Sequence, residues 1–295
     1  MSRYAILSDV HGNLDALNRV MSHLSGQTID EIWFLGDLVG YGPEPDACVQ
    51  ELFAYAGVLR GVRGNNDQSV IEEEGGSLQA IGELVSYGII DVKAERMSRI
   101  EAMELNQVWT QRQLSEEAYA LLEELKIPPL QVGGAICVHA NPCDPLGVDA
   151  SYLRTPADAE EAFICEKHLP IIFFGHTHHA GVFRQTTTER MYENVEYFSF
   201  SGFQSEMETF ELDDRRVLIN PGSIGQPRDG DRRAAYAVYD NEKGRVEFYR
   251  LDYPQDETIR KLEDLRGLEE KPEDKDKGMY NKMVDILIRR LKEAE

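Results

Sequence analysis

The sequence has few cysteines, no long apolar run and a shortage of basic residues, and each of these absences excludes a class of protein. Only 4 of the 295 residues are cysteines: Cys48, Cys137, Cys143 and Cys165. They form no C-x-x-C pair and no regular framework, so we expect reduced thiols rather than a disulfide scaffold. The apolar run near the N-terminus ends at Asp9 and is too short for a signal peptide or a membrane span. We therefore expect a cytoplasmic protein without membrane association.

Acidic residues outnumber basic ones by 53 to 31, which gives a formal net charge of −22 and an isoelectric point near 4.7. A surface of this sign repels polyanions, so nonspecific nucleic-acid binding is not expected. Hydrophobic residues make up 42% of the chain and charged residues 28%, which is ordinary for a soluble globular enzyme. The length suffices for one large α/β domain or two small ones.

The N-terminal part alternates between strand-like and helix-like patterns. Tyr4–Ser8 is typical of a buried strand, and apolar residues then recur at helical spacing from Leu14 to Leu24. Asn13 is a suitable N-cap for this helix, and Gly26 ends it. Further elements are expected in the order strand, helix, strand, at Ile32–Leu35, Pro45–Ala56 and Val58–Val62. This βαβαβ order predicts a largely parallel sheet covered by helices.

A helical block and then a series of strands follow. Residues 77–130 lack strand patterns and are interpreted as a helical insertion, with Ser115 as the N-cap of its last helix. Strands are expected at Ala135–Val138, Ile171–Phe174, Val182–Gln185, Val217–Ile219, Ala234–Tyr239 and Val246–Leu251. Because the later strands are spaced like an antiparallel meander, we expect the second half to form a sheet that closes against the first. Residues 1–251 are assigned to one α/β domain.

The C-terminal segment, residues 252–295, differs in composition. A run of charged residues over 269–277 is typical of a solvated linker. After it, an apolar stripe at helical spacing is formed by Met279, Met283, Ile286, Leu287 and Leu291. We expect this helix to dock on its own domain, and a homodimer formed through it is the alternative. Its polar face carries both signs of charge, which argues against a membrane element.

Five short segments carry polar residues with metal-binding chemistry, and each follows or adjoins an expected strand. They are Asp9-Val10-His11-Gly12-Asn13, Gly36-Asp37, Arg63-Gly64-Asn65-Asn66-Asp67, Val138-His139-Ala140 and Gly175-His176-Thr177-His178-His179. In an extended segment, residues two apart point the same way, so Asp9 and His11 can hold one ion together. His176 and His178 repeat this spacing. The two oxygens of Asp37 can bridge two cations, and Asn65 offers a neutral oxygen ligand.

Taken singly, each segment has an ordinary structural explanation, such as a capping acid, an Asn-rich turn or a core histidine. Their combination is much harder to explain in this way. Four of the seven histidines fall at strand ends beside glycine or small residues, and the strand ends of an α/β sheet meet at one crevice. The sequence therefore indicates a metal site, which would also supply the local positive charge that an acidic protein needs to bind a phosphate.

In this order, the five segments resemble the calcineurin-like metallophosphoesterase superfamily. The resemblance rests on Asp9-x-His11, Gly36-Asp37, Gly64-Asn65, His139 and Gly175-His176-x-His178, and it extends to residues 39–43 and 220–228. Those two stretches resemble a bacterial and archaeal branch of phosphodiesterases related to diadenosine tetraphosphatases. The resemblance covers about residues 2–251 and implies a four-layer αββα sandwich of two mixed β-sheets flanked by helices, with a two-metal site at its edge.

Transferred position by position, the resemblance assigns metal-binding roles to seven residues. Asp9, His11 and His178 would bind the first ion, Asn65, His139 and His176 the second, and Asp37 would bridge the two. This mixed set of nitrogen and oxygen ligands suits manganese, which we place first, and also iron, nickel or zinc. Two such ions would activate a water molecule for in-line attack on phosphorus. Asp37 and His139 are therefore expected to be essential for catalysis.

One catalytic position departs from the family pattern. The residue after Gly64-Asn65 is usually a histidine that protonates the leaving group, whereas this chain has Asn66. An amide cannot donate a proton at a useful pKa, so the reaction of poor leaving groups loses about a hundredfold or more in rate. Simple phosphate monoesters are affected most, and activated diesters or phosphoanhydrides least. Asn66 retains the capacity to hydrogen-bond the phosphate.

The predicted function is hydrolysis of phosphodiester or nucleotide phosphoanhydride bonds in a small phosphorylated or nucleotide substrate. The missing acid disfavours a serine/threonine protein phosphatase or phosphomonoesterase, and the complete ligand set disfavours a non-catalytic scaffold. Arg63 and Arg228, with Asn65 and Asn66, are candidates for substrate binding, although each arginine is equally compatible with a surface salt bridge. His179 is interpreted as an exposed loop residue, with a role as the substitute acid as the alternative. Residues 141–154 are interpreted as a specificity loop.

Overall fold

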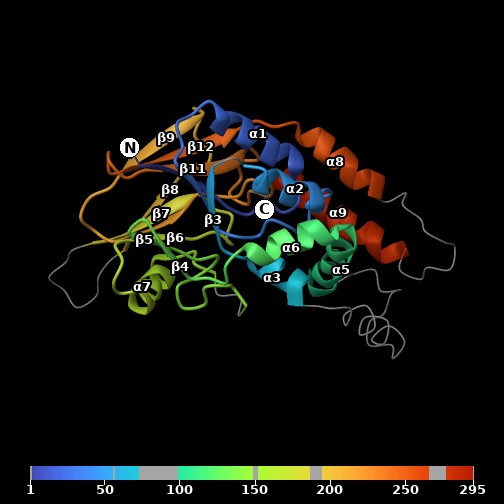
Figure 1. Ribbon diagram of the computed structural model, residues 1–295, viewed down its shortest axis with the longest axis horizontal. Helices are drawn as coiled ribbons and strands as arrows, with labels where there is room; N and C mark the ends of the chain where they lie inside the picture. Colours follow the sequence, from blue (N-terminus) through green and yellow to red (C-terminus); the bar gives the residue numbers. More distant parts are fainter. Residues whose placement is uncertain are drawn as a thin grey trace.

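The computed structural model describes residues 2–55, 57–72, 99–148, 152–186, 195–265 and 277–294. In these residues the chain forms two six-stranded mixed sheets that pack against each other, with helices on both outer faces (Figure 1). The predicted four-layer αββα sandwich is therefore confirmed. The helices expected over 77–98 and most of the charge run over 269–277 lie outside the described residues. None of the described helices is long and apolar enough to cross a lipid bilayer.

The first sheet has the strand order β3-β2-β1-β11-β12-β9. The parallel strands are those of the predicted βαβαβ unit, namely β1 (Arg3–Leu7), β2 (Glu31–Phe34) and β3 (Val58–Gly61). The antiparallel strands are β11 (Ala234–Asp240), β12 (Arg245–Leu251) and β9 (Met207–Glu211). The expectation that the second half forms a sheet of its own is thus wrong. All seven residues of β11 are buried, and a central position beside β1, covered on both faces, provides that burial.

The second sheet has the strand order β4-β5-β6-β10-β7-β8. Its strands are β4 (Leu130–Val132), β5 (Ala135–Cys137), β6 (Ile171–Phe173), β7 (Gly181–Gln185), β8 (Val195–Ser199) and β10 (Val217–Asn220). Among these, β5, β6 and β10 run parallel to one another. The sequence patterns did not predict β4, β8 or β9. All three are edge strands, and β8 and β9 bury one residue each, so their apolar alternation is weak.

Three hydrophobic layers hold the sandwich together. Trp33, Phe173 and Phe248 fill the space between the sheets and are almost fully buried. The outer face of the first sheet is covered by α1 (Leu14–Ser25), α2 (Pro45–Phe53) and α6 (Glu116–Glu124). The outer face of the second is covered by α7 (Pro156–Cys165), which the sequence patterns did not predict.

The C-terminal helix docks on its own chain. It is α9 (Lys277–Glu293), and it packs against α5 (Arg99–Gln113) and α8 (Gln255–Asp264) (Figure 1). Leu287 and Leu291 of the predicted stripe are buried in a cluster that also contains Tyr41. Tyr41 belongs to the loop after β2, which also carries Asp37. The docked helix therefore reaches the end of the sandwich where the predicted ligands lie.

Two of the four cysteines are joined. Cys143 and Cys165 form a disulfide that links the loop after His139 to the end of α7, whereas Cys48 and Cys137 are buried thiols. The expectation that all four are reduced is therefore wrong, because the fold brings together two cysteines 22 residues apart until their Cα atoms are 5.4 Å from each other. Disulfides are typical of oxidising compartments, so this bond does not favour the expected cytoplasmic location.

A buried ion pair fixes the turn that follows β10. The guanidinium of Arg250, on β12, pairs with Asp229 and donates a hydrogen bond to the carbonyl of Phe200 (3.1 Å). Asp229 also accepts the main-chain N–H of Ala180 at 3.2 Å. The pair therefore joins the first sheet to the segments next to Arg228 and His178.

We expect Arg250→Met to lower the free energy of unfolding by about 3–5 kcal/mol, because it leaves the Asp229 carboxylate buried without its cation. The double variant Arg250→Met/Asp229→Asn should recover part of this loss. Urea unfolding followed by circular dichroism measures both. Arg260→Met is the control, since the guanidinium of Arg260 pairs with Glu257 on the exposed face of α8. A loss no larger than that of the control would contradict the expectation.

Candidate metal centre

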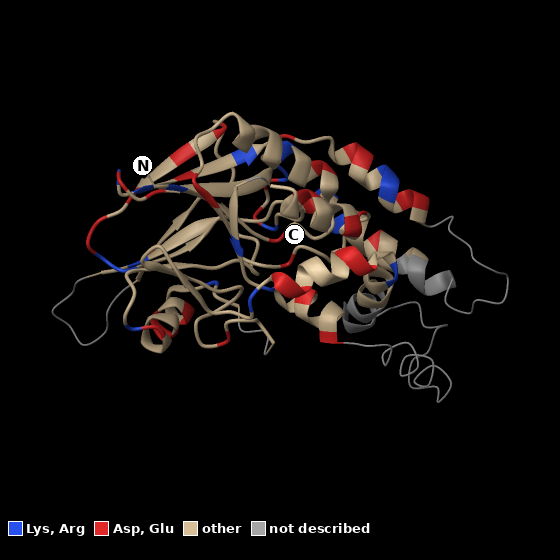
Figure 2. Ribbon diagram, in the orientation of Figure 1, with Lys and Arg blue, Asp and Glu red and all other residues tan. Residues whose placement is uncertain are grey.

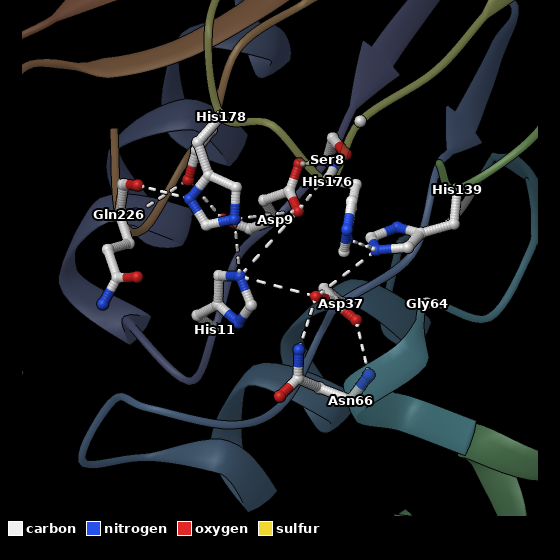
Figure 3. A network of polar contacts seen from close by, with 12 residues as sticks. Ser8, Asp9, His11, Asp37, Gly64, Asn66, His139, His176, His178 and Gln226 are labelled. Atoms are coloured by element: carbon white, nitrogen blue, oxygen red, sulfur yellow. Dashed lines mark hydrogen bonds and ion pairs between the residues drawn. The ribbon is translucent and has the colours of Figure 1, made fainter. Parts of the chain in front are cut away.

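The seven predicted metal ligands meet at one end of the sandwich, although they come from five strands. Asp9 and His11 follow β1, Asp37 follows β2, Asn65 follows β3, His139 follows β5, and His176 and His178 follow β6. These strands run parallel within their sheets, so their carboxyl ends lie at the same edge. Figure 3 shows the side chains of six of them pointing toward one another, namely Asp9, His11, Asp37, His139, His176 and His178. All but Asn65, which is half-buried, are buried.

The ligands divide into two groups. Asp9, His11 and His178 form the first and Asp37, His139 and His176 the second, and within each group the ligand atoms lie within 4.8 Å of one another. Asp37 also faces the first group, because its Oδ2 is 3.6 Å from Nε2 of His11 and 3.4 Å from Nε2 of His139. Oδ1 of Asn65 is 3.1 Å from Nε2 of His139. The structure thus brings together the residues predicted for each ion, with Asp37 between them.

Hydrogen bonds of three histidines show which ring nitrogen is available to a metal ion. Nδ1 faces a main-chain carbonyl oxygen in His11 (Val39, 3.3 Å), His139 (Leu35, 2.9 Å) and His178 (Gln226, 2.5 Å). A carbonyl only accepts, so in the neutral ring Nδ1 carries the hydrogen and Nε2 presents a lone pair. The Nε2 atoms of His11 and His178 are nevertheless 3.1 Å apart. Two lone pairs at this distance repel each other, and a cation between them removes the repulsion, so these residues fit a metal ion.

His176 presents the opposite ring nitrogen. Its Nδ1 is 3.2 Å from Nε2 of His139, whereas its Nε2 is buried and has no hydrogen-bond partner in the part of the chain that the structure describes. The ring stacks on Tyr152, with centroids 4.5 Å apart and an interplanar angle of 18°. This geometry favours Nδ1 as the ligand atom of His176.

Burial keeps most of these histidines neutral, which metal binding requires. It lowers the pKa of His11 and of His176 to about 3, and for the same reason the pKa of His178 lies well below its usual value. Burial also lowers the pKa of His139, but the carboxylate of Asp37 outweighs burial and raises it to about 9. His139 and Asp37 thus attract a positive charge between them, whether a proton or a metal ion.

Five of the seven candidate ligands have a backbone conformation that residues other than glycine rarely adopt. The φ angles are +54° at Asp9, +49° at His11, +58° at Asp37, +63° at His176 and +60° at His178. The expectation of extended segments at Asp9 and His11, and at the two histidines after β6, is therefore wrong. The members of each pair nevertheless reach the metal centre together. Each such residue costs about 1–3 kcal/mol, and strain of this kind concentrates at functional sites.

Asp67 holds this backbone in place, and the sequence reasoning assigned it no role. Its carboxylate accepts four main-chain N–H groups at 2.8–3.1 Å, from Asp37, Leu38, Val39 and Gly64. Asp67 is fully buried, and desolvation, followed by the charge of Asp37, raises its pKa to about 7. It joins the loops that carry Asp37 and Asn65. The signal in the sequence was an acidic residue three positions after Gly64 at the start of a helix.

Asn66 contacts the carboxylate of Asp37, which faces both ligand groups. It lies in the first turn of α3 (Asn65–Glu72), a helix that the sequence patterns did not predict. Its main-chain N–H donates to Oδ1 of Asp37 (2.9 Å) and its side-chain amide donates to Oδ2 (2.7 Å) (Figure 3). A Cβ on Gly64 would lie 2.0 Å from Oδ1 of Asp37, so only glycine fits before Asn65. Asn66 therefore orients Asp37, a contact that the sequence did not indicate.

The two candidate substrate arginines have different surroundings. Arg228 lies beside the ligands, because its main-chain N–H donates to the carbonyl of His178 (3.3 Å), and its Nη2 donates to the side chain of Gln226 (2.8 Å). The guanidinium of Arg63 instead donates to the side chain of Gln68 (3.1 Å) and the carbonyl of Glu123 (2.6 Å). These bonds join α3 to α6, so they assign Arg63 a structural role.

Tyr152, a described residue of the predicted specificity loop, lies against the second ligand group. Its ring stacks on His176, and the guanidinium carbon of Arg154 is 4.3 Å from the centre of the Tyr152 ring. His179 was expected to be exposed, but it is half-buried and, with Arg154 and Tyr197, lines a cavity of about 210 Å³. Its Nδ1 donates to the carbonyl of Thr177 at 2.6 Å.

We expect Asp67→Asn to weaken the metal centre, because an amide NH₂ group would face main-chain N–H donors and leave some of them unpaired. Affinity for Mn²⁺, measured by titration calorimetry, should fall about 10–100-fold, the usual effect of losing a group that orients a metal ligand. Asp158→Asn is the matched control, since Asp158 accepts the main-chain N–H groups of Arg154 and Thr155 at the start of α7. Equal affinities of the two variants would contradict this role of Asp67.

The chain is similar to known proteins in sequence and in fold. Residues 3–244 match the family model of the calcineurin-like phosphoesterase superfamily domain. The uncharacterized protein MJ0912 of Methanocaldococcus jannaschii is 29% identical over 255 residues, which are 85% of this chain and 88% of that protein. A crystal structure of a metallophosphoesterase from Sphaerobacter thermophilus is 30% identical, with a TM-score of 0.71 over 100% of this chain and 99% of that one.

The fold is also shared at lower identity by the hypothetical protein PH1004 from Pyrococcus horikoshii OT3. Its structure is 19% identical to this chain, with a TM-score of 0.66 over 97% of this chain and 98% of that one. The family match contains every strand of the two sheets except β12, and all five segments that carry the candidate ligands. This chain belongs to the calcineurin-like phosphoesterase superfamily.

Proposed function

We propose that this protein is a two-metal hydrolase that cleaves phosphodiester or nucleotide phosphoanhydride bonds. The observation that carries the proposal is the position of Asp37, whose Oδ2 faces His11 on one side and His139 on the other, between two ligand groups. Membership of a phosphoesterase family supports the class of reaction. A non-catalytic scaffold would not need a buried, strained and complete set of ligands.

Manganese is our first choice of metal, with iron, nickel or zinc as alternatives, because imidazole nitrogens combined with carboxylate and amide oxygens suit all four. When bound, two such ions lower the pKa of a shared water molecule and stabilise charge on the phosphoryl oxygens. Asp9, His11 and His178 would hold one ion, Asn65, His139 and His176 the other, and Asp37 both.

The chain's own hydrogen bonds orient these ligands before a substrate arrives. Ser8 donates to Oδ2 of Asp9 at 2.6 Å, and Asn66 donates to both oxygens of Asp37. Neither carboxylate is therefore free to rotate away from its ion. Acidic residues are spread over outer elements such as α6, α8 and β9 (Figure 2), so the positive charge that attracts a phosphate has to be local to the site. Arg228 adds such a charge beside His178.

Asn66 determines which phosphate esters react well. Its amide has no titratable proton to give to a leaving group. Substrates whose leaving group is stable as an anion, such as aryl diesters and phosphoanhydrides, do not depend on that proton. Alkyl monoesters do, and this argues against a phosphomonoesterase or a serine/threonine protein phosphatase.

We expect faster hydrolysis of bis-p-nitrophenyl phosphate than of p-nitrophenyl phosphate in the presence of Mn²⁺, as measured by release of p-nitrophenol. Asp37→Asn should abolish both reactions, because it removes the charge between the two ligand groups. Faster turnover of the monoester would contradict the diester assignment and favour a phosphomonoesterase. Activity that survives in Asp37→Asn would place the reaction elsewhere in the molecule.

The variant Asn66→His restores the missing acid and so tests whether this position sets the substrate preference. It should raise the rate of hydrolysis of β-glycerol phosphate, an alkyl monoester, by about a hundredfold. The rate of hydrolysis of bis-p-nitrophenyl phosphate should change little. Asn66→Gln, which retains an amide, should leave the ratio of the two rates unchanged. A ratio that Asn66→His does not alter would show that this position does not select the substrate.

A further inference from the structure

Two arginines far apart in the sequence meet beside the metal centre. Arg228 follows β10, and Arg290 lies on α9, which packs beside α5 and α8 (Figure 1). The apolar side of α9 shares a cluster with Tyr41. Their guanidinium carbons are 6.0 Å and 5.3 Å from the centre of the Tyr41 ring, within the range of cation–π contacts. The centroid of the same ring is 4.6 Å from that of His11, a candidate metal ligand. The Tyr41 ring therefore lies against both cations and against a member of the first ligand group.

Neither arginine is neutralised by an acid. Over the described residues, no carboxylate oxygen lies within ion-pair distance of Arg228 or Arg290, although acidic residues outnumber basic ones by 53 to 31 in the whole chain. Nε of Arg228 is buried without a hydrogen-bond partner in that part of the chain. Two like charges held together with no carboxylate in ion-pair contact are unfavourable, so an anion from outside the protein would stabilise them.

The fold fixes the position of both cations. Tyr41 has a φ of +65°, and its main-chain N–H donates to Oδ1 of Asn106 on α5 at 2.6 Å. The next residue, Gly42, donates its N–H to the carbonyl of His11 (2.8 Å). The Tyr41 ring packs in the apolar cluster of α8 and α9, with Leu287. The C-terminal helix therefore holds Arg290 against the same loop that joins the metal centre to Tyr41.

We propose that Arg228 and Arg290 form a subsite for a second phosphate group of the substrate, which makes a nucleotide phosphoanhydride the preferred substrate class over a diester with a single phosphate. This inference rests on the proposed function of the metal centre. The oxygen of a water molecule forms a bond to the phosphorus at the metal centre, and the bridging P–O bond breaks. Its electron pair leaves with the second phosphate, and the proton of the water passes to solvent.

The subsite also explains how the enzyme works with Asn66. A departing phosphate carries its negative charge without protonation, and the two guanidinium groups would bind that charge through charge-assisted hydrogen bonds. No general acid is then required at the position of Asn66. Binding of the second phosphate and the absence of a proton donor thus favour the same substrates.

The test compares two neighbouring arginines of α9. Arg290→Gln should raise KM for diadenosine tetraphosphate at least about tenfold, the effect of losing a charged hydrogen bond. The KM for bis-p-nitrophenyl phosphate should stay within about twofold of the wild-type value. Arg289→Gln is the matched control, because Arg289 is exposed and lies 3.9 Å from Glu293. Arg290→Lys retains a charge but not the planar donor group, so its KM for diadenosine tetraphosphate should lie between those of the wild type and Arg290→Gln. Equal effects of Arg290→Gln on the two substrates, or no effect on either, would overturn the subsite.

A binding measurement separates the subsite from the proposed function. Titration calorimetry of the full chain with inorganic pyrophosphate and with inorganic phosphate, both in Mn²⁺, should show that Arg290→Gln weakens pyrophosphate binding at least about tenfold and phosphate binding little. If the wild type hydrolyses neither diadenosine tetraphosphate nor bis-p-nitrophenyl phosphate but binds pyrophosphate through Arg290, the proposed function fails and the subsite stands. If the wild type hydrolyses the diester and pyrophosphate binding does not depend on Arg290, the proposed function stands and the subsite fails.

Discussion

The convergence of seven ligand side chains on two adjacent points constrains the whole of this end of the molecule. To reach those points, five ligands adopt positive φ angles, at a cost that together approaches the net stability of an ordinary domain, about 5–15 kcal/mol. The surrounding loops offset this cost. Asp67 binds four main-chain N–H groups around Asp37 and Gly64, and the main-chain N–H groups of Asp9 and His11 donate to the carbonyls of Gly36 and Asp37, each at 3.0 Å. The sandwich thus supplies the rigidity that the site needs, and bound metal ions would add to it.

Charge is organised in the same local way. The chain carries a net charge of −22, and its histidine ligands are mostly held neutral by burial, so an incoming phosphate depends on metal ions and on a few arginines. Arg228 comes from the turn that the Arg250–Asp229 pair fixes. Arg290 comes from α9, which lies beyond residues 3–244 that match the family. In our account the superfamily domain supplies the reaction, and the C-terminal helix adds selectivity for a second phosphate.

The sequence predicted the parts of the structure that local patterns specify. The apolar spacing and the Asn13 cap defined α1, the buried central strands were expected within a few residues of their bounds, and ordered motifs led to the ligands from five strand ends. Contacts between distant residues were not predictable in this way. The antiparallel pairing of β11 with β1 depends on burial of both faces, the Cys143–Cys165 bond on the docking of α7, and the role of Asp67 on main-chain groups from two loops. Positive φ at His11 and His178 also escaped prediction, because only the ligand geometry calls for it.

We propose above that the two ligand groups hold two metal ions that share Asp37. Anomalous X-ray scattering at the manganese edge, from crystals grown with Mn²⁺, tests it most directly. We expect two peaks, one against Asp9, His11 and His178 and one against Asn65, His139 and His176, with Oδ2 of Asp37 bound to both. In crystals of the variant Asp37→Asn, at least one of the two peaks should be lost. A single peak in the wild type at saturating Mn²⁺, or two peaks that do not share Asp37, would rule out a two-metal centre bridged by Asp37.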